Sequence, residues 1–263
     1  MTDPKPPRPK RAAKPRARPE NQAPLPPPKA KHPPAPPRLI VSIDPATTDG
    51  AAAALYCPGS AEIAQGARPA LIAVWSWRAS TAKAAGDGVR LGAAVIDVNG
   101  IVRPIDGDPY PSHPQIGATI AHHVSTIVAQ GVQVVIACEA PHATRFTTTS
   151  ATAITWVSGL IVGPILAAVP SAQLLRPTVR RWRSGLNLDP AAKPTADQIA
   201  PMLAAGIPTA LAAALHGRHA EGAVLPDDVV EAIAIGVWAG VTEGRPPKRA
   251  AKPRKAKAAQ PSA

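Results

Sequence analysis

Acidic residues at three places in the chain could bind a divalent metal ion. Asp44 follows the apolar run RLIVSI, Glu139 follows the apolar run VQVVIAC, and Asp228 and Glu231 lie three residues apart near the end of the chain. Carboxylate oxygens are hard ligands that select Mg²⁺ or Mn²⁺ over zinc. Two such ions can activate a water and stabilise the leaving oxygen of a phosphodiester, so this set predicts phosphodiester hydrolysis.

Two strands would have to place the first two acids. The runs at 38–43 and 132–138 are continuous and apolar, as is typical of strands that are covered on both faces. If these strands are parallel neighbours, Asp44 and Glu139 leave the sheet at the same carboxyl edge, where open α/β sheets bind ligands. Carboxylates at such close range need protons or cations to neutralise them.

A final helix over 226–240 would place the other two acids. Pro226 at a first-turn position, early acids and apolar residues at helical spacing predict this helix. Asp228 and Glu231 then share one face. Asp227 offers an alternative register for the metal ligand.

Each acid also has an ordinary structural interpretation. Asp44 precedes Pro45 and could be a turn residue, while Glu139 could be a surface charge at a strand end. The acids at 227, 228 and 231 could be a helix start that the helix dipole favours. Their joint placement at two strand ends and one helix start favours the metal site.

The remaining pattern predicts an α/β fold, a mixed sheet of about five strands with helices on both faces. The predicted elements are a hairpin strand at 51–56 after a turn at 47–50, strands at 70–77, 93–98 and 173–175, and helices at 116–130 and 148–169.

Composition divides the chain into one ordered domain at 38–244 and two tails at 1–37 and 245–263, which we expect to be disordered. The first 38 residues hold ten Lys or Arg against two acids, and the last tail holds seven Lys or Arg and no acid. The net charge of +12 therefore comes from the tails. They could attract nucleic-acid phosphates in a salt-dependent way, or serve as solubility segments or spacers.

Cysteine usage and hydropathy predict a cytoplasmic protein without a membrane span. Cys57 and Cys138 are too few for a disulfide framework and lack zinc-site spacing. The apolar stretch at 154–169 is short for a bilayer and contains Pro164, so it is predicted to be a buried core helix. The predicted location is the cytoplasm, in association with the nucleoid, or the host cytoplasm if the source is viral.

The segments IVSIDPATTDGAAAAL, VVIACEAPHA and LPDDVVEAIAIGVWA resemble the three acidic motifs of RuvC-type Holliday junction resolvases, which have a ribonuclease H-like fold. The resemblance places Asp44 first, Glu139 second, and Asp228 with Glu231 at the paired helix positions. It implies a homodimeric endonuclease that needs Mg²⁺, for which Mn²⁺ can substitute. Such an enzyme resolves four-way DNA junctions by paired nicks.

The segment LLRPTVRRWRSGLNLDPAAKPTADQI is similar to the family's stretch in which basic residues approach the scissile phosphate. The candidate phosphate contacts are Arg180, Arg181, Arg183 and Lys193. A solvated basic loop is the alternative. Trp182 could stack on a base or sugar, whereas Trp75, Trp77 and Trp156 lie in apolar runs and are predicted to be core residues.

Residues after Glu139 match the loop that approaches DNA near the junction centre in this family. Arg145 and the threonines at 147–149 are candidate DNA contacts there. Phe146 could wedge or stack, with a core position as the alternative. His142 is near the site in sequence but is not expected to take part.

The chain departs from the family pattern in several ways. Ala46 stands where a glycine is usual, and Glu231 replaces an aspartate and is one methylene longer. The stretch 57–114 is longer than the family's, and the tails are not part of the pattern. A nucleic-acid-binding accessory protein without catalysis, or a related nuclease that acts on RNA or other DNA structures, is the alternative function.

Overall fold

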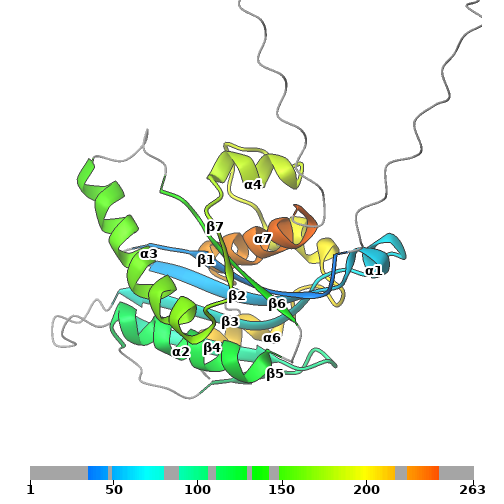
Figure 1. The fold of residues 1–263 in the computed structure, drawn as a ribbon, viewed down its shortest axis with the longest axis horizontal. Coiled ribbons are helices and arrows are strands. Elements are labelled where there is room, and N and C mark those ends of the chain that lie inside the picture. Colours follow the sequence, from blue (N-terminus) through cyan, green and yellow to red (C-terminus); the bar gives the residue numbers. More distant parts are fainter. Residues whose placement is uncertain are drawn as a thin grey trace, which may run out of the picture. The chain divides into compact units, whose positions relative to one another are not determined.

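In a computed structural model of the protein, seven strands form one mixed sheet within the residues that the structure describes, in the order β5-β4-β3-β2-β1-β6-β7 (Figure 1). Strands β1 to β5 pair antiparallel, and β1, β6 and β7 pair parallel. The strands are β1 (Arg38–Asp44), β2 (Asp49–Cys57), β3 (Ala70–Ala79), β4 (Val89–Ile96), β5 (Val102–Pro104), β6 (Gln133–Cys138) and β7 (Gln173–Leu175).

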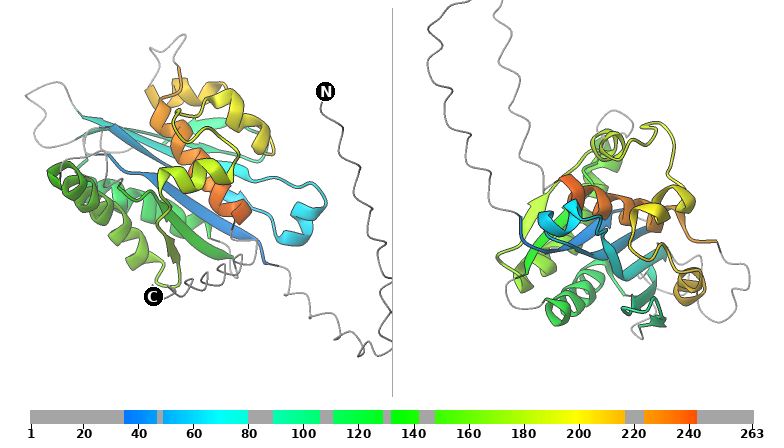
Figure 2. Two further views of the ribbon diagram at one scale, coloured as in Figure 1. Left: turned by 90° about the horizontal axis from the view of Figure 1, so that it is seen from above. Right: turned by 90° about the vertical axis from the view of Figure 1, so that its right-hand side faces the viewer.

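Helices cover both faces of the sheet, which confirms the predicted α/β architecture (Figure 2). Helices α2 and α3 lie on one face, and α7 lies on the other with α4, α5 and α6. The helices are α1 (Ser60–Ala64), α2 (His113–Ile127), α3 (Thr148–Ala168), α4 (Val179–Gly185), α5 (Ala196–Ile199), the short 3-10 helix η1 (Ala200–Met202), α6 (Ala210–His216) and α7 (Asp227–Thr242).

The structure describes residues 35–46, 49–79, 89–105, 111–128, 132–141, 148–216 and 224–242. These residues belong to one compact unit that begins at Pro34. The predicted tails, apart from residues 35–37, lie outside the described residues. So do part of the predicted turn at 47–50 and the candidate residues His142, Arg145, Phe146 and Thr147.

Side-chain alternation along β1 decides which face the first acid points to. Leu39, Val41 and Ile43 pack in the core under α2 and α3, whereas Ile40 packs in the core under α7. Successive side chains of a strand point to opposite faces, so Asp44, which is four residues after Ile40, points to the same α7 face as Ile40. In β6, residues 134, 136 and 138 face α2 and α3, whereas residues 135 and 137 face α7. Glu139 follows in the second series and is therefore also directed to the α7 face.

Helix α7 approaches the sheet closely because two glycines face the strands. A Cβ added to Gly236 would lie 2.8 Å from the Ser42 Oγ and would also clash with Leu55. A Cβ added to Gly240 would clash with Cys57. The missing side chains therefore let the helix that carries Asp228 and Glu231 lie directly over β1 and β2.

The sheet is larger than predicted. The sequence indicated about five strands and gave ranges for six of the seven that the described residues form. The seventh, β5, was not predicted, and β4 begins four residues earlier than expected. Strand β5 has three residues, ends at Pro104 and lies at the sheet edge, where proline is tolerated. Short edge strands leave little periodicity for sequence reasoning to detect.

Helix α3 is only partly the buried core helix that was predicted. Pro164 lies inside the helix without ending it, and Val157, Ile161 and Ile165 are buried against the sheet face that α2 also covers. Trp156, predicted to be core, is 70% exposed. Residues 151–168 have a mean hydropathy of 1.7 with 28% of the stretch buried, a composition that membrane spans and core helices share.

Candidate metal centre

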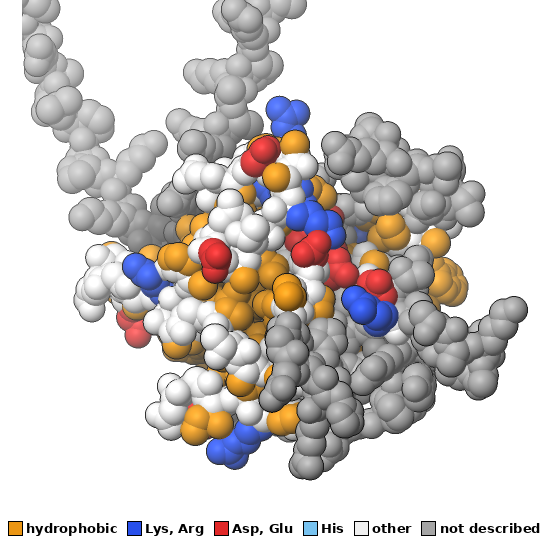
Figure 3. Space-filling model, turned by 180° about the vertical axis from the view of Figure 1, so that it is seen from behind, with side chains coloured by type: hydrophobic (Ala, Val, Ile, Leu, Met, Phe, Trp, Pro, Cys, Tyr) orange, Lys and Arg blue, Asp and Glu red, His pale blue; other side chains and the backbone are white. Residues whose placement is uncertain are grey.

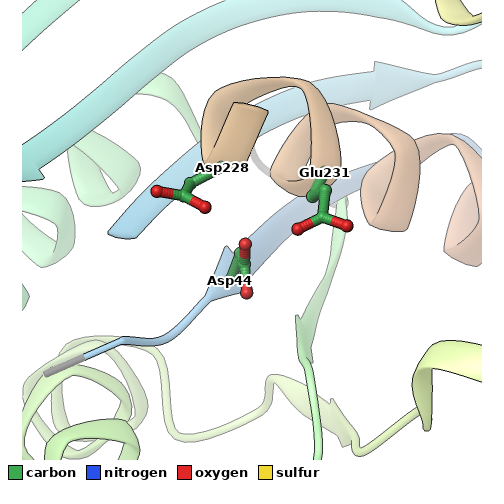
Figure 4. A group of neighbouring side chains, drawn as sticks. All are labelled: Asp44, Asp228 and Glu231. Atoms are coloured by element: carbon green, nitrogen blue, oxygen red, sulfur yellow. The ribbon is translucent and has the colours of Figure 1, made fainter. Parts of the chain in front are cut away.

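Three acids from two elements meet at the carboxyl end of β1 (Figure 4). Asp44 ends β1, and Asp228 and Glu231 lie on the first two turns of α7. Each offers a carboxylate oxygen, and the three oxygens lie within 4.8 Å of one another. A single divalent cation could contact all three, since oxygen ligands bind such ions at about 2.0 to 2.6 Å.

The fourth predicted acid, Glu139, lies beside this group without belonging to it. Its backbone N–H donates to the carbonyl of Ile43 at 3.0 Å, which extends the parallel pairing of β1 and β6 by one residue. Asp44 and Glu139 therefore follow paired positions on neighbouring strands, as predicted. The Glu139 Oε2 accepts a hydrogen bond from the Trp182 indole at 2.7 Å.

The electrostatics of the site correspond to one shared cluster of acids. Burial raises the pKa of Asp44 well above its usual value, and the charges of Glu139, Glu231 and Asp228 raise it further, against a lowering by Lys193. Burial also raises the pKa of Asp228, which Lys193 partly offsets. Like charges held together in a partly dry site create a demand for a cation.

Glu139 has a pKa raised to about 7. Burial is the main cause, the hydrogen bond from Trp182 opposes it, and the charge of Glu231 adds to it. A carboxyl group with such a pKa holds its proton part of the time at neutral pH, and a bound cation would favour its release.

Arg183 is buried, whereas a residue that contacts DNA must be exposed. The sequence analysis placed it among the phosphate contacts, but the residue is 8% exposed, and its side chain forms an ion pair with Glu231, a residue that is 7% exposed. Its Nη1 also donates to the carbonyl of Pro190 at 3.3 Å. A buried guanidinium whose partner is a carboxylate is occupied inside the protein, so Arg183 is corrected from a surface contact to a partner of the acidic site.

Trp182 is likewise corrected, because it is fully buried and cannot stack on a base. It lies on α4, which the sequence analysis treated as a basic segment without secondary structure. Val179, Trp182 and Leu186 have helical spacing and could have indicated that one side of this segment is buried. No local signal indicated that the indole would reach Glu139.

Three of the predicted basic residues remain exposed, and one of them, Lys193, lies beside the acids. Lys193 Nζ lies 3.4 Å from Asp227 Oδ2 and 3.8 Å from Asp228 Oδ1. Burial lowers the Lys193 pKa, but the neighbouring acids outweigh this effect and raise it. Arg180 and Arg181 are exposed. Figure 3, a view from behind Figure 1, shows Lys or Arg side chains beside Asp or Glu side chains.

The raised pKa values predict an unusual pH dependence of stability. In the folded protein, Asp44 and Glu139 keep their protons to a higher pH than they do in the unfolded chain. In the unfolded chain, Glu139 has the ordinary carboxyl pKa of 4.5. Without metal, the free energy of unfolding should therefore fall as the pH rises from about 5 to about 8, by about 3 kcal/mol for Glu139 alone. Thermal melts across this range measure it.

Magnesium should reverse this trend, since a cation neutralises the ionised acids. We expect the increase in melting temperature on adding Mg²⁺ to be larger at about pH 8 than at about pH 5. A metal-free melting temperature that stays level or climbs over this range would contradict the assigned protonation. An equal Mg²⁺ effect at both pH values would contradict a metal site made of these acids.

No protein-family model and no curated protein sequence matches the chain. Among solved structures, the chain is similar to the Thermus thermophilus RuvC structure, with 13% sequence identity and a TM-score of 0.37, over 76% of this chain and 92% of that one. It is also similar to T. thermophilus RuvC in complex with Holliday junction substrate, with 14% identity and a TM-score of 0.36, over 76% and 91% of the two chains. Similarity of this degree transfers no activity or residue role to this chain.

Proposed function

We propose that the protein is a metal-dependent endonuclease with a ribonuclease H-like core of the RuvC type, which hydrolyses phosphodiester bonds in branched DNA. The observation that carries the proposal is the convergence of Asp44, Asp228 and Glu231, with oxygens within 4.8 Å of one another. Without a cation, the mutual repulsion of acids from β1 and α7 costs stability. A functional role explains why they meet.

The donor set fits Mg²⁺ or Mn²⁺ because all of its ligand atoms are carboxylate oxygens. Asp44, Asp228 and Glu231 would hold the ion, with Glu139 beside them. When bound, the ion supplies Lewis-acid activation of water and charge stabilisation at the phosphate. Lys193, which is exposed at the edge of the acidic group, would contact a phosphate of the DNA backbone, and Arg180 and Arg181 would add to this contact.

A cleavage assay tests the function. Purified protein with Mg²⁺ should introduce symmetric nicks into a synthetic four-way DNA junction and should leave it intact when the metal is chelated. Intact junctions at equal amounts of protein and DNA would contradict the proposal. Flap, duplex, single-strand and RNA–DNA hybrid substrates in the same assay identify a related nuclease, and metal-independent binding without cutting identifies an accessory protein.

Paired nicks require two active sites, and we propose that two copies pair through the exposed side of α3. Trp156 protrudes there, and beside it lies a hollow of about 450 Å³. The hollow is lined by Ala151, Thr152, Thr155, Trp156, Gly159 and Leu160. Gly159 and Gly163 have open space above their Cα atoms, so a second helix could approach closely.

Replacing Trp156 by Lys should weaken this dimer. A central tryptophan typically contributes about 2 kcal/mol or more to an interface, so the dimer dissociation constant should rise by about 30-fold or more. Light scattering during size-exclusion chromatography over a concentration series measures it. The matched control is Thr126→Lys on the exposed side of α2. A dimer that is unaffected by the Trp156 change, or a wild-type monomer at all concentrations, would contradict pairing through α3.

A further inference from the structure

Trp182 is held in a fixed place beside Glu139. The residue is fully buried on α4, a helix that Thr178 caps by accepting a hydrogen bond from the Arg181 N–H at 3.4 Å. The segment before α4 is tied to the end of β6, since the Ala140 N–H donates to the carbonyl of Pro177 at 2.8 Å. The indole is therefore anchored relative to the strand that ends at Glu139.

Helix α4 also packs tightly on α7, which carries the other two acids. A Cβ added to Gly185 would lie 2.5 Å from the Trp238 indole nitrogen, so the two helices touch at this glycine. The Arg181 guanidinium lies over the Trp238 ring, 5.5 Å from its centre. These contacts join β6, α4 and α7 into one packed unit around the carboxylates.

The hydrogen bond from Trp182 engages one of the two carboxylate oxygens of Glu139. The indole N–H donates to Oε2 at 2.7 Å, which leaves Oε1 as the oxygen without this partner. An indole N–H is a neutral donor that neither titrates nor accepts. It can orient a carboxylate without cancelling its charge, whereas an arginine would compete with a cation for the same group.

We propose that Trp182 is a positioning residue that orients Glu139 toward the divalent cation, an inference that rests on the proposed metal-dependent function. Groups that orient metal ligands through hydrogen bonds typically contribute about 10-fold to 100-fold to metal affinity. Loss of the indole N–H should weaken metal binding by this amount, and it should do so through Glu139.

Trp182→Phe removes the N–H and keeps an aromatic ring in the core. Trp77→Phe is the matched control, because Trp77 is also buried and its indole nitrogen has no hydrogen-bond partner among the described residues. Both changes cost packing, and Trp182→Phe also loses a hydrogen bond, so it should lower the melting temperature more than Trp77→Phe does. In calorimetric titrations with Mn²⁺, only Trp182→Phe should raise the dissociation constant, by about 10-fold to 100-fold.

A double-mutant cycle shows whether Trp182 acts through Glu139. Glu139→Gln alone should also weaken Mn²⁺ binding, and adding Trp182→Phe to it should cause little further loss. Full additivity of the two changes would overturn the inference. An equal loss of affinity in Trp77→Phe would also overturn it, because the effect would then come from packing.

Nuclear magnetic resonance of the indole N–H groups separates this inference from the proposed function. The chain has five tryptophans, and Trp182→Phe assigns the Trp182 signal. Glu139→Gln should shift that signal strongly and the Trp77 signal little, and Mg²⁺ should shift it in a saturable way. If the chemical shift of the Trp182 indole N–H is the same in Glu139→Gln as in wild type, the inference is overturned even if Mg²⁺ binds. If no signal responds to Mg²⁺ and Mn²⁺ releases no heat, the metal function fails and the inference with it.

Discussion

Replacing Asp44 by Asn is expected to abolish metal binding and DNA cleavage while it stabilises the metal-free protein. Asp44 is the residue that joins the sheet to the acids of α7 in the proposed site, and an amide is a much weaker ligand than a carboxylate. Loss of an orienting group costs about 10-fold to 100-fold in metal affinity, so loss of a ligand should cost more than about 100-fold. Cleavage should fall at least as far.

The gain in stability has a separate cause. Burial and three neighbouring acids raise the pKa of Asp44, so the folded protein pays to ionise it at neutral pH. An amide of the same shape removes that repulsion, and we expect the free energy of unfolding without metal to increase, by the roughly 0.5 to 2 kcal/mol that is usual for a stabilising substitution. A gain in stability with a loss of activity is typical of residues that are kept for function.

Asp197→Asn is the matched control, because Asp197 is exposed on α5 and lies outside the acidic group. It should change neither Mg²⁺ binding nor cleavage. Denaturant titrations with and without Mg²⁺ measure both parts of the prediction. If Asp44→Asn destabilises the metal-free protein and Mg²⁺ still binds with unchanged affinity, Asp44 is a structural residue and the proposed site is wrong.

The parts of the site that could be predicted depend on local pattern. The apolar runs before Asp44 and Glu139 identify β1 and β6, and apolar spacing after Pro226 identifies α7. Parallel pairing of β1 with β6 was a condition of the prediction, and the structure confirms it. Once the strands pair, the period of two along each strand directs both acids to the face that α7 covers.

The parts that could not be predicted depend on how a short helix docks. Helix α4 has seven residues, of which three are arginines. Which arginine is buried follows from the contact of α4 with α7, and that contact depends on Gly185 lying against Trp238. The family resemblance therefore indicated basic contacts in this segment, and tertiary packing separated the buried Arg183 from the exposed Arg180 and Arg181.

Replacing Arg183 by Met should be strongly destabilising. Arg183 and Glu231 form a buried ion pair, and the loss of one partner from such a pair typically costs about 3 to 5 kcal/mol because the other charge is left uncompensated. Glu231 would then face Asp44 and Asp228 without its guanidinium. Denaturant titration of the metal-free protein measures the loss. Arg180→Met, on the exposed side of the same helix, should stay within about 0.5 kcal/mol of wild type.

The same variant tests whether Glu231 belongs to the metal centre. Without the guanidinium the acidic group is more negative, so Mg²⁺ should bind Arg183→Met at least as tightly as wild type and should recover part of the lost stability. Adding Glu231→Gln should also recover stability without metal, since it removes the uncompensated charge. A loss below about 1 kcal/mol would contradict the buried pair. A full loss that neither Mg²⁺ nor Glu231→Gln relieves would mean that Arg183 stabilises the fold through packing, and that Glu231 lies outside the cation's reach.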